Sequence, residues 1–439
     1  MYKLLLVIAL LCVLNTSAQI LPERERATVI NEILNDKFKN LLPDLMDKAA
    51  VDMWIIISRE YNEDPVLRTM LPATWLNARR RTILVFSRNK ETDTLESLAV
   101  ARYEVGESIE AAWDPEKKPE QWKALIDIIE KRDPQKIALN SSKNYGLADG
   151  LVKTDSDEFM DYLPLKYKNR LVSGEDLAVG WIETRSQMEM EIYPQLVEIT
   201  KNIIREAFSE EVIIPGETTT EDVVWWMRQK VTDLGLETWF HPTVSIQRDE
   251  EALEDHISAF SSNKEGKIIY DGDLLHCDFG ITYLRLNTDC QQMAYVLKPG
   301  ETEAPEFLQQ AFKKGNQVQD ILTENFDTGK SGNQILSESL DQAREEGLKP
   351  MIYTHPLGLY GHSAGTTIGM WDSQDGVPGS GEYLLNENTV YAIELNTSVF
   401  LREWNQEIRI MLEEAGFWGE GGFSYLNGGQ EELILISSE

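Results

Sequence analysis

The sequence predicts an α+β protein in which a smaller α/β domain precedes a larger α+β domain. The chain has 439 residues, which is long enough for two domains with separate cores. Short, continuous apolar runs dominate its first part, whereas amphipathic helices, strand-like runs and further helices follow in the second. The composition, with 42% hydrophobic and 9% aromatic residues, is that of a folded globular protein and excludes a disordered chain.

Residues 1–18 predict a cleaved secretory signal peptide. A single Lys precedes the apolar run of residues 4–11, and small residues at 16–18 suit a cleavage site. Asn15 ends the apolar segment before the roughly 20 residues that a membrane span needs. The alternatives are an uncleaved anchor and lipid attachment at Cys12. We therefore expect an exported protein, periplasmic or secreted, without stable membrane insertion.

The charge of the chain argues against two classes of partner. The formal net charge is −32, and such an acidic surface repels phosphate backbones and anionic membranes. The acidic residues are spread along the sequence and form no block, which is typical of a solvated surface. We therefore expect no nucleic-acid partner.

The N-terminal domain is expected to span residues 19–176. Continuous apolar runs of four or five residues are typical of strands that are covered on both faces. Helical patterns flank these strands, and the pattern loosens into charged, loop-like sequence at the expected boundary. The expected elements are a helix at 23–49 that breaks at Pro43, strands at 53–57, 82–86 and 98–101, and a helix at 122–129.

The second domain, residues 177–439, is expected to open with two amphipathic helices. In the first, apolar residues recur at helical spacing over 192–203, and Pro194 limits its start or bends it. In the second, Thr220 is the expected N-cap and Gly235 the stop.

Two aspartates on neighbouring strand-like runs indicate a chemical site. Asp278 and Asp289 are 11 residues apart, with a turn-like segment between them. Buried acids are costly without a cationic or hydrogen-bonding partner. Downstream the chain offers a further candidate set, namely His355, His362, Glu394 and Glu413. Two Asp, one His and two Glu make a mostly oxygen-donor site that suits two Mn(II) or related divalent ions. Taken singly, each acid has a duller interpretation as a turn, cap or solvent-facing residue, and each histidine as a structural one.

The order of these residues resembles that of the pita-bread metallopeptidases, a family that includes methionine aminopeptidase, aminopeptidase P and prolidase. The sequence has the two aspartates, then Thr-His-Pro-Leu-Gly-Leu-Tyr-Gly-His, a Glu on an apolar strand and a last Glu near the C-terminus. The two-domain plan resembles the aminopeptidase P, prolidase and creatinase branch, which implies a C-terminal pita-bread domain behind a smaller creatinase-like α/β domain. The resemblance implies five metal ligands, with Asp289 and Glu413 bridging: Asp278, Asp289, His355, Glu394 and Glu413.

The resemblance also implies an activity. We expect hydrolysis of an amide bond near the N-terminus of short peptides, as in an Xaa-Pro aminopeptidase or dipeptidase. Two divalent ions, Mn(II) foremost and Zn, Co or Fe as alternatives, would activate a shared water. Glu394 would then move its proton, and His362 would bond the oxyanion. A homodimer is implied as well. The rival interpretations are a creatinase-like, metal-independent C–N hydrolase and a catalytically silent binding protein.

Several residues near the motifs carry weaker expectations. His241 and His256 lie where related enzymes bring a histidine to the substrate, and His276 alternates with Asp278 and is expected to support or pack against the site. The sequence also departs from the aminopeptidase P and prolidase pattern. Residues 350–353 lack the expected further histidine, and Met411 stands where an arginine is usual. Glu413 is preferred over Glu414 as the ligand because Glu413 is in phase with Arg409 and Met411.

Cys277 and Cys290 each lie beside one of the two aspartates. In a regular antiparallel register that pairs Asp278 with Asp289, the two cysteines would lie opposite each other. We expect them to be close enough for a disulfide in an oxidising compartment. The alternative is two small buried residues.

Overall fold

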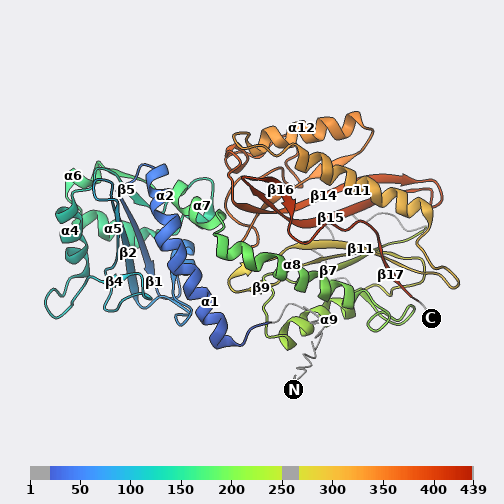
Figure 1. Cartoon of the computed structure of the whole chain (residues 1–439), viewed down its shortest axis with the longest axis horizontal. Coiled ribbons are helices and arrows are strands. Elements are labelled where there is room, and N and C mark those ends of the chain that lie inside the picture. The colour runs from blue at the N-terminus through green and yellow to red at the C-terminus, as the bar shows by residue number, and fades with distance from the viewer. Residues whose placement is uncertain (1–19, 250–265, 438–439) are drawn as a thin grey trace, which may run out of the picture.

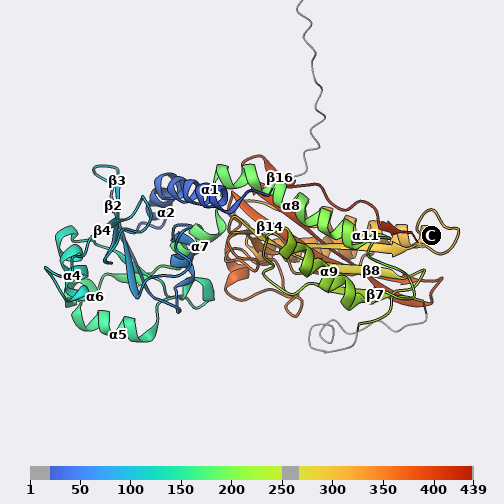
Figure 2. The ribbon, with the colours of Figure 1, turned by 90° about the horizontal axis from the view of Figure 1, so that it is seen from below.

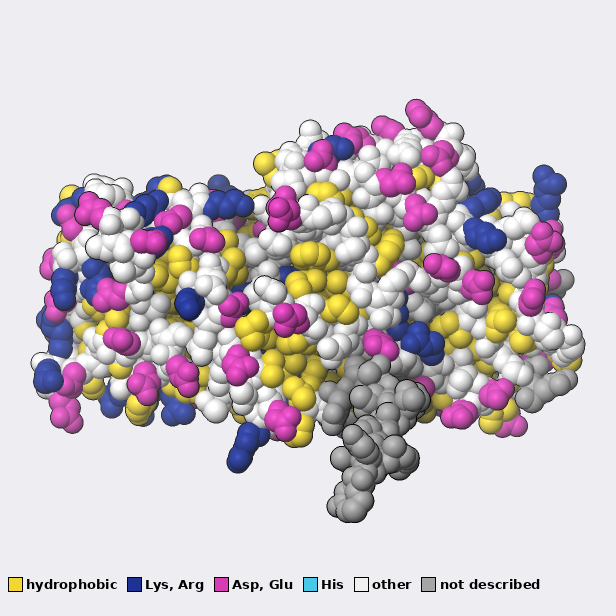
Figure 3. All heavy atoms as spheres, viewed as in Figure 1, with side chains coloured by type: hydrophobic (Ala, Val, Ile, Leu, Met, Phe, Trp, Pro, Cys, Tyr) yellow, Lys and Arg dark blue, Asp and Glu magenta, His cyan; other side chains and the backbone are white. Residues whose placement is uncertain are grey.

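The computed structural model describes residues 20–249 and 266–437. The expected signal peptide and His256 lie outside this part of the chain. The described residues form two lobes along the long axis of the molecule (Figure 1). Within these residues, no helix has the length and apolar character needed to cross a membrane. Acidic side chains are scattered over the visible face of both lobes and form no single block, as the sequence predicted (Figure 3).

The first lobe is built on a six-stranded sheet with the order β4-β3-β2-β1-β5-β6. Its central strand β1 pairs antiparallel with β2 and parallel with β5. The predicted strands at 53–57 and 82–86 are present. The predicted strand at 98–101 begins earlier in the structure, as β3, and ends at Ala99. The bounds are β1 Met53–Arg59, β2 Arg81–Asn89, β3 Thr94–Ala99, β4 Glu110–Ala111, β5 Ile137–Leu139 and β6 Leu171–Ser173.

Helices cover both faces of this sheet (Figure 2). On β1, Trp54 and Ile56 join the core under α1 and α2, whereas the alternate residues Met53 and Ile55 join the core under α4 and α5. This two-sided burial explains the continuous apolar runs. The helices are α1 Glu23–Asp36, α2 Leu42–Lys48, α3 Pro65–Met70, α4 Gln121–Arg132, α5 Lys153–Tyr162 and α6 Leu165–Lys168, with a 3-10 turn at Gly146–Ala148.

The predicted helix break at Pro43 is wrong. Pro43 lies in the first turn of α2, where a missing backbone N–H costs nothing. The chain instead passes from α1 to α2 through a π-helical turn at Lys37–Leu41. There the buried Lys37 donates to the carbonyls of Trp181 and Thr184 and pairs with Glu189. These bonds tie the first helices to the start of the second lobe.

The connection between the lobes runs through α7, Glu175–Glu183, and α8, Gln187–Ala207. α7 packs with the first core, where Trp181 stacks on Phe38 at 5.2 Å. α8 starts at a capping box formed by Ser186 and Glu189 and packs with the core of the second lobe.

Helices of the second lobe follow the predicted pattern with one correction. Pro194 lies inside α8. α9 begins one residue earlier than predicted, because Thr219 is the N-cap and exchanges hydrogen bonds with Asp222 in a capping box. Gly235, at φ 66°, follows the end of α9 as expected. The helices are α9 Thr220–Asp233, α11 Glu306–Glu324 and α12 Gly332–Glu345, with a 3-10 turn at Ser380–Glu382.

The second lobe carries a nine-stranded sheet. Its main path is β12-β14-β15-β11-β8-β7, and β13, β16 and β17 pair with β14, β15 and β11. β9 and β10 form a separate two-stranded hairpin. The bounds are β7 Thr243–Gln247, β8 Leu274–Phe279, β9 Thr282–Tyr283, β10 Leu286–Asn287, β11 Cys290–Val296, β12 Pro350–Ile352, β13 His355–Leu357, β14 Thr389–Leu401, β15 Gln406–Gly419, β16 Gly422–Tyr425 and β17 Ile434–Ile436.

The predicted register of the aspartate hairpin is wrong. Its turn is centred on Leu284 and Arg285, both at positive φ, which is one residue later than a pairing of 278 with 289 requires. Cys290 therefore lies opposite Phe279, and Cys277 opposite Gln292. Both cysteines are free and buried in the core that also contains Phe279, so they are two small buried residues.

Candidate metal centre

The site is built on one row of side chains that crosses the second sheet. Glu394 on β14 lies opposite Glu413 on β15, Glu413 lies opposite Gln291 on β11, and Gln291 lies opposite Asp278 on β8. Residues that pair directly across strands project from the same face. Leu275, Cys277 and Phe279 point into the core with α8 and α9, so Asp278 must point the other way.

Two further ligand candidates complete the group. Asp289 immediately precedes β11, and His355 begins β13, which pairs with β14. His355 Nε2 lies 3.7 Å from Asp289 Oδ2, 3.7 Å from Glu413 Oε1 and 3.8 Å from Glu394 Oε2. The structure thus brings together all five residues that the sequence singled out as ligands.

These residues divide into overlapping groups. Potential ligand atoms of Asp278, Asp289 and Glu413 lie within 4.8 Å of one another, and so do those of His355, Glu394 and Glu413. Glu413 belongs to both groups, as a residue that bridges two ions would. Asp289 also groups with His355 and His362.

Unpaired buried atoms indicate that the residues fit a cation. Asp278 Oδ1, Asp289 Oδ1, His355 Nε2 and Glu413 Oε1 are buried without a hydrogen-bond partner among the described residues. Each unsatisfied buried polar group costs roughly 1–3 kcal/mol, and more when it is charged. Four such atoms that converge on one space are explained by a divalent cation, which would compensate them together.

The electrostatics of the carboxylates support the same conclusion. Burial raises the pKa of Asp278 to about 7. Burial and the neighbouring carboxylates also raise the pKa of Asp289, Glu394 and Glu413 well above the ordinary range. A bound cation would reverse this tendency and hold the acids ionised at neutral pH.

His355 presents the correct nitrogen for metal binding. Its Nδ1 lies 3.0 Å from the Pro356 carbonyl, to which only an Nδ1–H can donate. The unprotonated Nε2 therefore faces the carboxylates. Burial, and then proximity to His362, lowers the pKa of His355 to about 3, so the imidazole is neutral, as a ligand must be.

His362 lies at the open side of the cluster. Its exposed ring meets the ring of His355 edge-on at 4.8 Å and that of Trp239 at 5.2 Å. Burial of part of the ring lowers the pKa of His362. This position, beside the ligands and open to solvent, is compatible with the predicted contact to a substrate.

His241 is not brought into the cluster. Its exposed ring packs on Trp225 at 5.3 Å, and its Nδ1 lies 3.1 Å from Arg228 Nη1, both on α9. None of the ligand groups among the described residues includes it. The other predicted substrate contact, His256, lies outside the described residues.

Glu414 has a different role from Glu413. It is buried and accepts hydrogen bonds from Gln292 at 3.0 Å and from the Gln430 N–H at 2.7 Å. The Lys201 ammonium, also buried, lies 2.6 Å from its other oxygen. Glu414 is therefore engaged in a buried ion pair away from the ligand row, which favours Glu413 as the ligand.

The sequence reasoning missed three residues around the site. Gln291 donates to Glu394 Oε1 at 2.5 Å. Trp239 donates to the Thr288 carbonyl at 2.8 Å and packs on His362. Tyr353 lies in the segment without the expected histidine, and its hydroxyl accepts from Asn396 at 3.0 Å. Of these three residues, only Gln291 could have been found from the sequence. It is two residues after Asp289, and residues at that spacing on a strand project from the same face.

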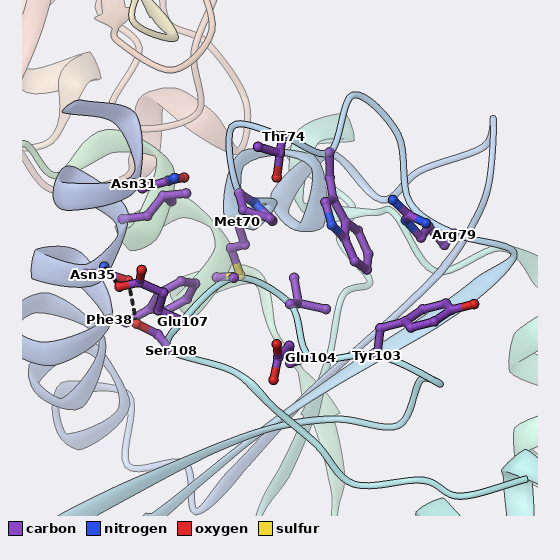
Figure 4. A pocket seen from close by; sticks show the side chains of 15 residues that line it. Asn31, Asn35, Phe38, Met70, Thr74, Arg79, Tyr103, Glu104, Glu107 and Ser108 are labelled. Atoms are coloured by element: carbon purple, nitrogen blue, oxygen red, sulfur yellow. Dashed lines mark hydrogen bonds between the residues drawn. The ribbon is translucent and has the colours of Figure 1, made fainter. Parts of the chain in front are cut away.

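A separate hollow lies in the first lobe, with a volume of about 390 Å³ (Figure 4). Arg79 stacks there on Trp75 and Tyr103, with its Cζ 4.8 Å and 5.7 Å from the ring centroids. None of the five ligand candidates lines this hollow. This hollow is therefore separate from the ligand groups on the second sheet.

Fold and site together define a two-domain protein with a carboxylate-rich group of residues that could hold divalent cations. A sequence model of metallopeptidase family M24 matches residues 191–419, more than half of the chain, and this segment includes all five ligand candidates. The chain therefore belongs to metallopeptidase family M24. Members of this family depend on divalent metals. Membership supports the interpretation of the protein as a peptidase, which is a hydrolase. No curated protein sequence matches it significantly.

Solved structures of similar fold cover both lobes. An X-Pro aminopeptidase from Thermotoga maritima has 17% identity and a TM-score of 0.62, covering 90% of this chain and 100% of its own. An Xaa-Pro dipeptidase from Bacillus anthracis has 14% identity and a TM-score of 0.56, covering 93% and 99%. The N-terminal domain of the FACT complex subunit SPT16 from Cicer arietinum has 12% identity and a TM-score of 0.52, covering 94% and 99%. These likenesses establish the predicted two-domain pita-bread fold.

Proposed function

We propose that the protein is a metallo-aminopeptidase or dipeptidase that hydrolyses an amide bond near the N-terminus of short peptides. The observation that carries the proposal is the pair of ligand groups that share Glu413. The names of the similar Thermotoga and Bacillus structures favour a proline after the scissile bond.

Two divalent cations would be held by the overlapping groups. Asp278, Asp289 and Glu413 form one set of donors, and His355, Glu394 and Glu413 form the other. Carboxylate oxygens with a single imidazole suit Mn(II) better than a thiophilic ion. When bound, such a pair polarises the scissile carbonyl and lowers the pKa of water.

Glu394 is placed to move the proton. Its Oε1 accepts from Gln291, which leaves Oε2 facing the cluster. Glu394 takes a proton from the attacking water and returns it to the leaving nitrogen.

His362 is placed to stabilise the transition state. Its ring lies at the open side of the site and is kept in position by His355 and Trp239. A ring N–H donates to the oxyanion that develops on the former carbonyl.

The departures from the aminopeptidase P and prolidase pattern support a second candidate. The buried Tyr353 lies in the segment 350–353, in which the aminopeptidase P and prolidase pattern has a further histidine. Met411 stands where that pattern has an arginine. A binding protein of the same fold without peptidase activity is compatible with both. The similar fold of a FACT complex subunit domain adds support for this alternative.

Hydrolysis of a small peptide panel distinguishes these candidates. Ala-Pro, Ala-Pro-Ala, Ala-Ala and Ala-Ala-Ala are incubated with metal-depleted protein, with and without Mn(II). The proposal predicts Mn(II)-dependent cleavage that Asp289→Ala abolishes and that Asp341→Ala, a change at an exposed acid on α12, leaves intact. Absence of cleavage in all arms favours the binding protein, and preference for Ala-Pro-Ala over Ala-Ala-Ala establishes proline selectivity.

We also propose that the protein is exported, which residues 1–18 support. We further propose that it forms a homodimer, which the resemblance to two-domain enzymes supports. Light scattering tests the dimer, because one chain has a mass of 50.1 kDa. A mass near twice that value supports the homodimer, and a mass near one chain contradicts it.

A further inference from the structure

Three polar side chains outside the ligand set form one line of contacts that ends on Glu394. Ser245 Oγ lies 3.5 Å from His276 Nδ1, and His276 Nε2 lies 2.9 Å from Gln291 Oε1. Gln291 Nε2 lies 2.5 Å from Glu394 Oε1. The line crosses three neighbouring strands, β7, β8 and β11, before it reaches β14.

The register of the sheet places these side chains on the face of the site. Ser245 lies directly opposite His276, and Gln291 lies directly opposite Asp278. Because His276 and Asp278 are two residues apart on β8, they project from the same face. His276 and Gln291 are buried, so their polar atoms depend on protein partners and not on solvent for hydrogen bonds.

The chemistry of the groups gives the line a single direction. An ionised carboxylate only accepts, so the amide N–H of Gln291 faces Glu394 and its carbonyl faces His276. That carbonyl also only accepts, so His276 donates from Nε2–H. Its Nδ1 is then the acceptor that faces the Ser245 hydroxyl.

The far end of the line divides the two oxygens of Glu394. Oε1 is engaged by Gln291, whereas Oε2 lies 3.8 Å from His355 Nε2, inside the ligand cluster. A freely rotating carboxylate could present either oxygen or both to a cation.

We propose that Gln291, itself oriented by His276, is a positioning residue that restricts Glu394 to one metal-binding oxygen. The proposal rests on the metal centre of the proposed function. Without the His276 contact, the Gln291 amide can turn over and present its carbonyl to the carboxylate, which is repulsive. His276 therefore acts on the metal centre although it binds no metal itself.

The neighbouring residue offers a matched control. Gln292 is the same residue type, is equally buried at 4% exposure and lies on the same strand. It projects from the opposite face and donates to Glu414, which is not in the ligand groups. A general effect of losing a buried glutamine amide therefore appears in Gln292→Leu as well, whereas an effect on Glu394 does not.

The test is Mn(II) affinity, measured by calorimetric titration of the metal-depleted full chain. Changes to residues that orient a ligand typically cost 10- to 100-fold in metal affinity. We expect a loss of about that size in Gln291→Leu, a smaller loss in His276→Leu and unchanged affinity in Gln292→Leu. Gln291→Met, which keeps the length of the side chain without a donor, serves if Gln291→Leu does not fold. The low-temperature Mn(II) spin-resonance spectrum reports changed coordination independently of activity.

The outcomes separate this inference from the proposed function. If the wild type binds Mn(II) and Gln291→Leu or Gln291→Met binds it equally well with the same spectrum, the positioning role is overturned and the metal centre stands. Equal losses in the Gln291 and Gln292 variants also overturn it. If the wild type binds no divalent ion, both proposals fail.

Discussion

Glu394 and Glu413 lie directly opposite each other in the antiparallel ladder of β14 and β15. Two like charges in such a cross-strand pair destabilise a sheet. Both side chains are largely buried, at 17% and 1% exposure, so solvent screens them poorly. Burial at such a cost is explained by a site that binds a cation, in which function opposes stability.

The first prediction concerns the stability of the metal-free protein. Glu413→Gln replaces a buried acid, which repels the neighbouring carboxylates when it is ionised, by a neutral amide, so the unfolding temperature of the metal-depleted protein should rise by a few degrees. The same variant should lose the stabilisation that Mn(II) gives the wild type. Calorimetry with and without a chelator measures both effects. A fall in the unfolding temperature of the metal-depleted variant would contradict the cost assigned to this carboxylate.

The second prediction is the pH dependence of the metal-free protein. Burial raises the pKa of Asp278 from 3.8 when unfolded to about 7 when folded, so the folded state binds more protons between these values. Its contribution to stability is complete below pH 4 and is lost as the pH rises through 7. Asp278→Asn should flatten the decline in the free energy of unfolding over this range. An unchanged slope in urea titrations at several pH values would refute the assignment.

Metal binding should show the opposite trend with pH. Ions compete with protons for the carboxylates, so the affinity for Mn(II) should rise between pH 5 and pH 8. Titration calorimetry in two buffers of different ionisation enthalpy measures the protons released. Binding that releases no protons would contradict the raised pKa of Asp278.

A further prediction concerns the role of His362 in catalysis. His362→Ala removes a donor to the developing oxyanion, and one such donor is worth about 10²–10³ in kcat. The Mn(II) content should stay unchanged, because the cluster retains five other ligand candidates. Loss of bound metal in this variant would instead make His362 a ligand.

A structural prediction follows from the buried ion pair. Lys201→Met leaves the Glu414 carboxylate uncompensated, with a cost of about 3–5 kcal/mol in the free energy of unfolding. Mn(II) affinity should remain that of the wild type, since Glu414 lies outside the ligand groups. Urea unfolding and metal titration of one preparation test both statements. Loss of metal with intact stability would reopen the choice between Glu413 and Glu414.

The five ligand candidates were singled out by their order along the chain, which resembles that of the pita-bread metallopeptidases, and the structure brings these residues together. Each of them lies on or beside a strand, so the sequence also indicated the elements that carry them. The register of the hairpin was not accessible. Its turn places Leu284 and Arg285 at positive φ. Neither residue type favours such a turn, whereas an Asn-Gly pair would have predicted one. The disulfide expectation failed for that reason.

Contacts between distant segments were also beyond the sequence. Gln291 meets Glu394 only because β14, β15 and β11 pair in one register, which no periodicity within a single strand reveals. His241 was assigned to the substrate by its position in the chain, but its ring turns toward α9. Pairing between distant strands decided the first case, and packing on the preceding helix decided the second.

The measurement that tests the central claim most directly is the number of Mn(II) ions bound per chain after equilibrium dialysis, determined by mass spectrometry of the metal. The two overlapping ligand groups predict two ions in the wild type and fewer in Asp289→Ala. One ion or none in the saturated wild type would contradict a dinuclear centre.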